Sequence, residues 1–237
     1  MSAARDRART AGPQHPRAFP RQPSHAGRAR ERAGSAFKRA TDLLVAIVLL
    51  TGLAPALLSI AVAVRLDSPG PALFRQRRVG RQGREFSMLK FRSMAVNAPP
   101  DLHRRYVEKL FDEKPGPSDS ALRKLTGDPR VTRIGAILRR TSIDELPQLL
   151  NVLVGQMSLV GPRPAVAYEL EHYRPHHYER FAVRPGLTGL WQVSGRARLG
   201  LQAMLDLDVE YARNRSLMLD LRMLLKTPKA VLDAFTA

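Results

Sequence analysis

The chain of 237 residues contains no cysteine. Disulfide bonds and metal sites built on cysteine thiolates are therefore excluded. Acidic residues are also scarce: 21 Asp and Glu stand against 39 Lys and Arg, and the formal net charge is +18. So large an excess of positive charge indicates an anionic partner surface, such as a nucleic acid, a phospholipid or a phosphorylated substrate.

The first 35 residues differ in composition from the rest of the chain. Residues 1–35 are rich in Arg, Pro, Ala, Gly and Ser, and Phe19 is their one aromatic residue. This composition predicts a disordered basic tail. A secretory signal peptide is disfavoured, because the apolar run begins too late and no small-residue cleavage site follows it. A solvated tail and a tether to the membrane surface both remain open.

Residues 43–64 carry no charge and form the one long apolar run of the chain. As a helix rising about 1.5 Å per residue, this run would just cross a hydrocarbon core of about 30 Å. Pro55 lies near its middle and bends a helix by removing a backbone donor. Basic residues flank both ends, Lys38 before and Arg65 after, which places both ends on the cytoplasmic side. We therefore predict a membrane-embedded re-entrant helix over residues 36–66; a straight span and a buried core helix are the alternatives.

Residues 67–237 are expected to form a compact cytosolic domain of helix-rich α+β class. Within it, residues 72–79 and 85–94, separated by a Gly-containing loop, predict a small β-hairpin. Lys90 and Arg92 share a strand face at a spacing of two. That face is interpreted as a phosphate-facing surface, with a solvated basic face as the alternative.

Three further segments show helical patterns. Residues 97–124 predict a helix followed by a loop, and residues 131–140 predict a short amphipathic helix. Residues 198–225 predict one or two amphipathic helices that pack on the core or lie at the membrane interface. His176 and His177 fall in a polar helical stretch, where a solvated face is favoured over metal ligation.

An acidic pair, Asp144 and Glu145, stands at a predicted helix start. Ser142 followed three residues later by Glu145 is typical of a capping box, and apolar residues at Leu146 and Leu149 follow. On this reading the two carboxylates complement the positive end of the helix. Their surroundings suggest a second reading, in which the pair carries chemistry on an anionic substrate.

Two loops downstream carry Gly, Pro and Arg. Residues 157–164 end in a rigid turn that presents Arg163, and residues 186–196 contain three glycines, Gln192 and Arg196. Such a glycine-containing loop can bring backbone N–H groups close to a phosphate.

From about residue 37 to residue 227 the chain resembles the bacterial sugar transferases, the monotopic phosphoglycosyl transferases that act on polyprenol phosphate. The resemblance includes Arg140-Thr-Ser-Ile-Asp-Glu-Leu-Pro-Gln-Leu-Leu-Asn151 and Met157-Ser-Leu-Val-Gly-Pro-Arg-Pro164. The other matching segments are residues 38–42, 75–80, 90–94 and 184–196. Longer relatives carry additional N-terminal membrane helices and a further domain, so the chain is expected to be the minimal catalytic form.

The resemblance implies transfer of a sugar 1-phosphate from a UDP-sugar to undecaprenyl phosphate, with Mg²⁺ and release of UMP. This is the first membrane step of exopolysaccharide, capsule or glycoconjugate synthesis. Asp144 would be the nucleophile that forms an aspartyl phosphosugar, and Glu145 its essential, metal-binding neighbour. An aspartate is ordinarily ionised at pH 7 and needs no general base to attack phosphorus. Basic and Gly/Pro-loop positions make up the expected nucleotide and diphosphate site: Lys90, Arg92, Arg163, Gln192 and Arg196.

The resemblance also implies a place in the cell. The enzyme would sit on the inner, cytoplasmic membrane with its catalytic domain on the cytoplasmic face, in contact with membrane lipid and other polysaccharide-assembly glycosyltransferases. No nucleic acid partner is expected. The membrane helix of the family breaks at a Ser-Pro pair, but here the pair is Ala54-Pro55. Thr51 and Ser59 are the hydroxyls that could replace the missing serine.

Two other classes of function compete with this one. A non-catalytic, membrane-anchored basic protein that binds anionic lipid or nucleic acid would suit the charge and the tail. It would leave Asp144 and Glu145 without a purpose, and no nucleic-acid fold signature is present. A direct glycosyltransferase with an Asp or Glu base would release UDP in place of UMP, so the nucleotide product separates the two enzymes.

Overall fold

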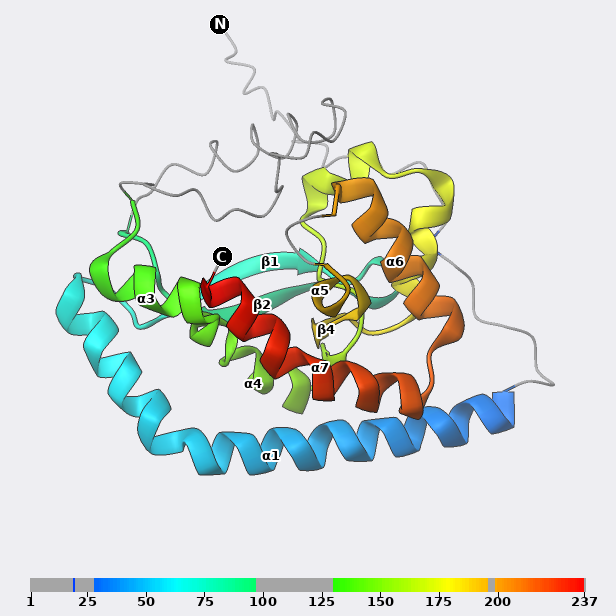
Figure 1. The fold of residues 1–237 in the computed structure, drawn as a ribbon, viewed down its shortest axis with the longest axis horizontal. Coiled ribbons are helices and arrows are strands. Elements are labelled where there is room, and N and C mark those ends of the chain that lie inside the picture. Colours follow the sequence, from blue (N-terminus) through cyan, green and yellow to red (C-terminus); the bar gives the residue numbers. More distant parts are fainter. Residues whose placement is uncertain (1–18, 20–27, 97–129, 196–198, 237) are drawn as a thin grey trace, which may run out of the picture.

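The structure of the chain, a computed structural model, describes residues 19, 28–96, 130–195 and 199–236. It has the predicted helix-rich α+β architecture (Figure 1). The expected helix and loop over residues 97–124 lie outside the described part, as do Arg196 and all but Phe19 of the first 27 residues. In chain order the elements are α1 (Arg28–Asp67), β1 (Leu73–Val79), η2 (Arg81–Gly83), β2 (Glu85–Phe91), α3 (Arg133–Thr141), η3 (Ile143–Glu145), α4 (Gln148–Leu153), β3 (Ser158–Val160), η4 (Ala167–His172), η5 (Pro175–Ala182), β4 (Gly186–Thr188), α5 (Leu190–Val193), α6 (Leu201–Asn214) and α7 (Leu217–Thr236), where η marks a 3-10 helix.

Helix α1 is 40 residues long and begins inside the stretch assigned to the tail. Its segment Gly34–Asp67 is long and apolar enough to cross a membrane, by length and composition. The helix runs along one side of the molecule and changes direction part way (Figure 1). Pro55 lies inside it, and the Ser59 hydroxyl donates to the Pro55 carbonyl at 3.0 Å. Because Pro55 has no N–H, the Thr51 carbonyl four residues earlier loses its helical donor. The Ser59 hydroxyl bonds a different carbonyl and does not replace that donor.

The start of α1 is bonded to the folded domain. Lys38 donates to the carboxylate of Asp220 on α7 at 2.6 Å. Asp42 is buried and accepts from the Ser158 hydroxyl of β3 at 2.7 Å. Arg39 donates to the last two carbonyls of α4 at 2.6 and 2.9 Å. These bonds fix the first part of α1 against α4, β3 and α7.

The end of α1 is bonded to the same domain. Arg92, at the end of β2, is 5% exposed and donates to carbonyls at the end of α1, including those of Val64 and Ser68. Asp67 accepts from the backbone N–H of Ile134, in the first turn of α3, at 3.0 Å. The orphan carbonyls of a helix end are thus satisfied by a buried guanidinium. Both ends of α1 therefore attach to a single folded body.

The predicted hairpin is confirmed. β1 and β2 pair antiparallel, from Leu73 opposite Phe91 to Val79 opposite Glu85. Because side chains alternate between faces along a strand, Arg78 and Lys90 share one face of the hairpin. A second, two-stranded sheet is parallel and pairs β3 with β4.

Glycines in the two downstream loops allow the backbones of β3 and β4 to approach. A Cβ on Gly161 would lie 2.4 Å from the Arg184 carbonyl oxygen, and one on Gly186 would lie 2.1 Å from the Gly161 nitrogen. Gly186, one of the three glycines in the loop predicted to approach a phosphate, is thus required for packing that loop against Gly161.

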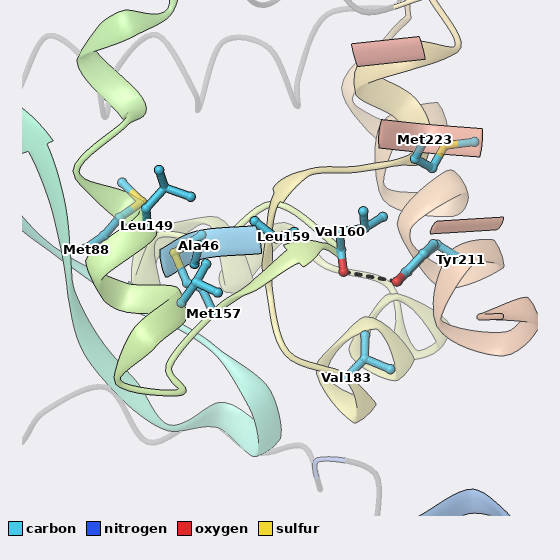
Figure 2. Close-up of a cluster of buried hydrophobic side chains, with 10 residues drawn as sticks. Ala46, Met88, Leu149, Met157, Leu159, Val160, Val183, Tyr211 and Met223 are labelled. Atoms are coloured by element: carbon cyan, nitrogen blue, oxygen red, sulfur yellow. Dashed lines mark hydrogen bonds between the residues drawn. The ribbon is translucent and has the colours of Figure 1, made fainter. Parts of the chain in front are cut away.

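A cluster of buried apolar side chains joins the elements around the hairpin (Figure 2). Ala46 comes from α1, Met88 from β2, Leu149 from α4 and Tyr211 from α6. The Tyr211 hydroxyl donates to the Val160 carbonyl of β3 at 3.0 Å, so its polar end is satisfied within the core. The core therefore fixes α4, which follows the acidic pair in the chain, and β2, which carries Lys90.

The segment predicted as one or two amphipathic helices forms two, α6 and α7. α6 contributes buried residues to the core, whereas α7 exposes Leu217, Leu221 and Leu225 at 42, 51 and 72%. Their spacing of four places them along one side of the helix, and we call them the α7 apolar stripe. Such a stripe agrees with the predicted interfacial role of this segment.

Candidate functional site

The acidic pair lies in the 3-10 turn η3, between α3 and α4. Ser142 has a left-handed backbone (φ 60°) and ends α3, with its N–H directed at the Arg139 carbonyl. Its side chain caps no helix, so the predicted capping box is wrong. The Glu145 carboxylate pairs with Lys90. The strained turn matters because it brings Asp144 and Glu145 against the hairpin.

Lys90 and Glu145 form the central contact of the site. The Lys90 Nζ lies 2.8 Å from Glu145 Oε1, with the two side chains 19 and 34% exposed. Asp144, next to this pair, is 7% exposed. The prediction that Lys90 faces the site is supported by its position, since β2 delivers it to the acidic pair. Partial burial strengthens the pair relative to one on the open surface.

Arg78 is a further basic residue at this site, and its role was not predicted. It is 3% exposed and donates to the Pro164 carbonyl at 3.1 Å. Burial, and then the charge of Arg163, lower the pKa of Arg78 to about 10, while Glu169, then Tyr168 and least of all Glu145 act in the opposite direction. Arg78 therefore lies within electrostatic reach of both Arg163 and Glu145. The signal in the sequence was the alternation of side chains along β1, which puts Arg78 on the same face as Lys90 once the pairing register of β1 with β2 is known.

A buried ion pair holds the loop that carries Arg163. Arg180 of η5 and Asp208 of α6 are 4 and 1% exposed and lie 2.6 Å apart. Arg180 also donates to the Arg163 carbonyl and to the Tyr173 hydroxyl. Burial raises the pKa of Asp208 to about 7, against the lowering effect of Arg180. Together with the bond from Arg78 to the next residue of the loop, this pair fixes the backbone on both sides of Arg163.

The other predicted substrate-binding residues are placed differently. Arg92 caps the end of α1, so the substrate-binding role predicted for it is not supported. Gln192 folds back on its own loop, where its amide nitrogen donates to the Leu187 carbonyl at 3.2 Å. Arg196 lies outside the described residues. Of the five predicted residues, Lys90 and Arg163 are thus the two that the described structure brings to the acidic pair or to its neighbour Arg78.

A cluster of His176, His177 and Asp206 resembles a metal site, but the tautomer of His177 does not suit metal binding. Asp206 lies 2.9 Å from His176 Nε2 and 3.1 Å from His177 Nε2. The backbone N–H of Arg174 donates to His177 Nδ1, so the proton of the neutral ring must be on Nε2. His177 then donates to Asp206 and offers no lone pair to a metal. Its ring is fully buried, so the predicted solvated face is wrong for this residue.

The acidic pair itself offers the ligands that Mg²⁺ prefers. Carboxylate oxygens suit this ion, which is usually bound by one or two carboxylates together with substrate phosphates and water. Within the described ranges, the one group of three His, Cys, Asp or Glu side chains with converging ligand atoms is the histidine cluster, so no third such ligand joins Asp144 and Glu145. One carboxylate of the pair would be enough to hold a Mg²⁺ ion if phosphate oxygens and water supplied its other ligands.

Comparison with known proteins identifies the family. The model of the bacterial sugar transferase family matches residues 33–234. The chain is 42% identical over 200 residues to the exopolysaccharide production protein ExoY of Sinorhizobium fredii, a match that covers 84% of this chain and 86% of that protein. It is 42% identical over 208 residues to the UDP-glucose:undecaprenyl-phosphate glucose-1-phosphate transferase of Xanthomonas campestris pv. campestris, covering 84% of this chain and 40% of that one.

A third relative is the undecaprenyl-phosphate galactose phosphotransferase of Salmonella typhimurium, 40% identical over 202 residues, with 85% of this chain and 42% of that protein covered. The chain thus spans most of the Sinorhizobium protein and less than half of the other two. Because the family model matches most of the chain, the chain is a member of the bacterial sugar transferase family.

Proposed function

We propose that this enzyme transfers a sugar 1-phosphate from a UDP-sugar to undecaprenyl phosphate and releases UMP. The names of the Xanthomonas and Salmonella relatives support the substrate classes. The observation that carries the proposal is the Lys90–Glu145 ion pair beside the buried Asp144. It joins an acidic pair to the basic face of the hairpin, where Arg78 and Arg163 add positive charge. The lipid-linked sugar phosphate would be the substrate of later glycosyltransferases in polysaccharide assembly.

In the first step, a carboxylate oxygen of Asp144 attacks the phosphorus that carries the sugar. A bond forms between this oxygen and phosphorus, and the bond from that phosphorus to the bridging oxygen of UMP breaks, so UMP leaves with the electron pair. In the second step, a phosphate oxygen of undecaprenyl phosphate attacks the same phosphorus. The bond to Asp144 breaks, the carboxylate is restored and the lipid diphosphate sugar is the product.

Positive charge near the reacting phosphorus lowers the barrier, because negative charge spreads over the phosphoryl oxygens and the leaving group. We propose that Lys90 and Arg163 supply this charge, with the buried Arg78 behind them. Mg²⁺ bound through Glu145 would neutralise further charge on the diphosphate. With or without the ion, Lys90 orients the Glu145 carboxylate. Its ammonium group bonds one carboxylate oxygen, and this fixes the direction in which the second oxygen points.

We further propose that α1 enters and leaves the membrane on one side, the cytoplasmic side. Lys38 at its start and the carbonyls at its end are both hydrogen bonded to the same folded domain. A straight crossing would separate these two attachments by the thickness of the bilayer and break one set. The re-entrant arrangement keeps the soluble UDP-sugar and the membrane-bound acceptor at one surface, where Asp144 can reach both.

A nucleotide-release assay tests the proposed function. The purified full chain is incubated in detergent with Mg²⁺, undecaprenyl phosphate and, in separate reactions, UDP-glucose, UDP-galactose and N-acetylated UDP-sugars. We expect UMP from at least one donor, no turnover by Asp144→Asn, and unchanged turnover by the exposed control Glu171→Gln. UDP as the product would indicate direct glycosyl transfer and contradict the proposal.

A further inference from the structure

A cavity of about 210 Å³ opens at the start of α1, where that helix meets the start of α7. Its wall is formed by α1, by the turn η2 of the hairpin, by the residues before β4 and by the junction of α6 with α7. Since a water molecule occupies about 30 Å³ in the liquid, the cavity has room for a group the size of a phosphate with its first substituents. None of the residues of the candidate active site lines it.

The wall of this cavity is basic. Lys38, Arg81, Arg184 and Arg215 line it, together with the carboxylates of Asp42 and Asp220 and several hydroxyl groups. Both carboxylates are occupied within the wall. Asp42 accepts from the Ser158 hydroxyl, and Asp220 accepts from Lys38 and from the Tyr211 hydroxyl, both at 2.6 Å. Four cationic side chains against two carboxylates leave an excess of positive charge that favours an anion.

The arginines come from three separate segments of the chain. Arg81 belongs to η2, Arg184 precedes β4, and Arg215 lies between α6 and α7. Arg184 is held in place by donating to the Gly155 carbonyl at 3.0 Å. A guanidinium presents several N–H donors in a planar fork that matches the oxygens of a phosphate. Converging arginines on a fixed frame are thus suited to a phosphate group.

Apolar surface adjoins the cavity on α7, and the membrane-type segment of α1 begins at the cavity with Gly34. Leu217, the first residue of the α7 apolar stripe, lines the cavity, and the stripe leads away from it along α7. On α1, the membrane-type segment continues from the cavity with Leu44 and Val48 exposed at 64 and 60%. α1 and α7 start close to each other (Figure 1). A phosphate in the cavity could therefore carry hydrocarbon chains that lie on this surface.

We propose that this cavity is a second ligand site, which binds the headgroup phosphate of an anionic membrane phospholipid. The basic wall holds the phosphate, and the adjoining apolar residues of α1 and α7 lie against the acyl chains. A soluble nucleotide would gain nothing from those apolar residues, whereas a phospholipid uses both parts of the site. Binding here would fix the junction of α1 and α7 at the membrane surface. The proposal concerns binding alone and does not depend on the transfer reaction.

A binding measurement tests it. The full chain in a neutral detergent is titrated with dihexanoyl phosphatidylglycerol, and bound lipid is counted by native mass spectrometry. Arg215→Gln removes one wall arginine, and Arg222→Gln, which changes an exposed arginine of α7 outside the cavity, is the matched control. Loss of a hydrogen bond between a charged donor and a phosphate should weaken binding roughly tenfold or more in Arg215→Gln. The control should bind like the unchanged protein.

Two further arms identify the source of the phosphate, and a second variant protects the test against misfolding. Inorganic phosphate alone should bind much more weakly than the lipid; equal affinity would overturn the lipid assignment. Undecaprenyl phosphate should not displace the phosphatidylglycerol; displacement that disappears in Arg215→Gln would make the cavity an acceptor site and overturn the proposal. If Arg215→Gln fails to fold, Arg81→Gln decides by the same criterion. Equal lipid binding by the unchanged protein and the folded wall variants would refute the site.

Discussion

Replacing Arg180 with methionine tests how the loop that carries Arg163 is held. Methionine keeps much of the apolar stem but removes the guanidinium, which is 4% exposed and bonds Asp208, the Arg163 carbonyl and Tyr173. The change leaves the Asp208 carboxylate buried without its cation. Breaking a buried ion pair by removing one partner costs about 3–5 kcal/mol. At about 2–4 °C per kcal/mol for a chain of this size, the midpoint of thermal unfolding should fall by about 6–20 °C.

The fluorescence of the single tryptophan, the buried Trp191, reports this unfolding. The control is Arg213→Met, which breaks the exposed Arg213–Glu179 pair (2.7 Å) and should change the midpoint little. The loss in Arg180→Met should also be larger at pH 8.5 than at pH 6. Protonation of Asp208 removes the cost of burying its charge. Because burial raises the pKa of Asp208 in the folded state, the folded protein loses stability as pH rises through that pKa.

The double variant Arg180→Met with Asp208→Leu separates stability from positioning. Removing both charges should restore much of the lost stability, because apolar residues often replace a buried ion pair without loss. Turnover should stay low and the apparent KM for the UDP-sugar high, since the Arg163 carbonyl still lacks its donor. If Arg180→Met unfolded at the same temperature as Arg213→Met, the buried pair would not hold this loop and the reasoning would be wrong.

Three other predictions concern Lys90, Arg92 and His177. Lys90→Met should lower kcat roughly 10²–10³-fold, as loss of a group that stabilises developing charge does, with little change in the unfolding midpoint; a large stability loss with unchanged kcat would contradict the site. Arg92→Met should remove the cap on α1 and destabilise the fold by about 2–4 kcal/mol in thermal unfolding, and a change in KM without destabilisation would restore its substrate role. Because burial lowers the pKa of His177, the unfolded chain takes up a proton below about pH 6.5 that the folded chain resists, and stability should fall by up to about 1.4 kcal/mol per pH unit. His177→Gln should flatten this dependence in unfolding measured from pH 7.5 to 5.5, and His172→Gln should not.

Local patterns predicted most of the elements correctly. The hairpin, the short helix after residue 130 and the paired C-terminal helices follow from periodicity and turn residues, which act over a few positions. The capping box failed because Ser142 adopts a left-handed backbone to end α3, and that tertiary demand outweighed the local motif. The acidic pair was singled out because of its surroundings, and Lys90 because it shares a strand face with a second basic residue; the contact between Lys90 and Glu145 appears only in the fold.

Residues whose role depends on distant partners could not be placed from the sequence. The spacing of two put Lys90 and Arg92 on one face, but β2 ends at Phe91, and Arg92 turns to the end of α1. Arg78 shares its face with Lys90, yet its importance rests on contacts with residues 163–164, far along the chain. The glycines of the later loops have a packing role that appears only when β3 and β4 are brought together.

The most direct test of the account is the mass of the intact protein after incubation with its UDP-sugar and Mg²⁺ in the absence of undecaprenyl phosphate. The account predicts an added mass of one sugar phosphate, located on the peptide that contains Asp144, with an equal amount of UMP released. Undecaprenyl phosphate added afterwards should remove this mass, and Asp144→Asn should never acquire it. Full turnover by Asp144→Asn, or an adduct on another residue, would contradict the assignment of Asp144 as the nucleophile.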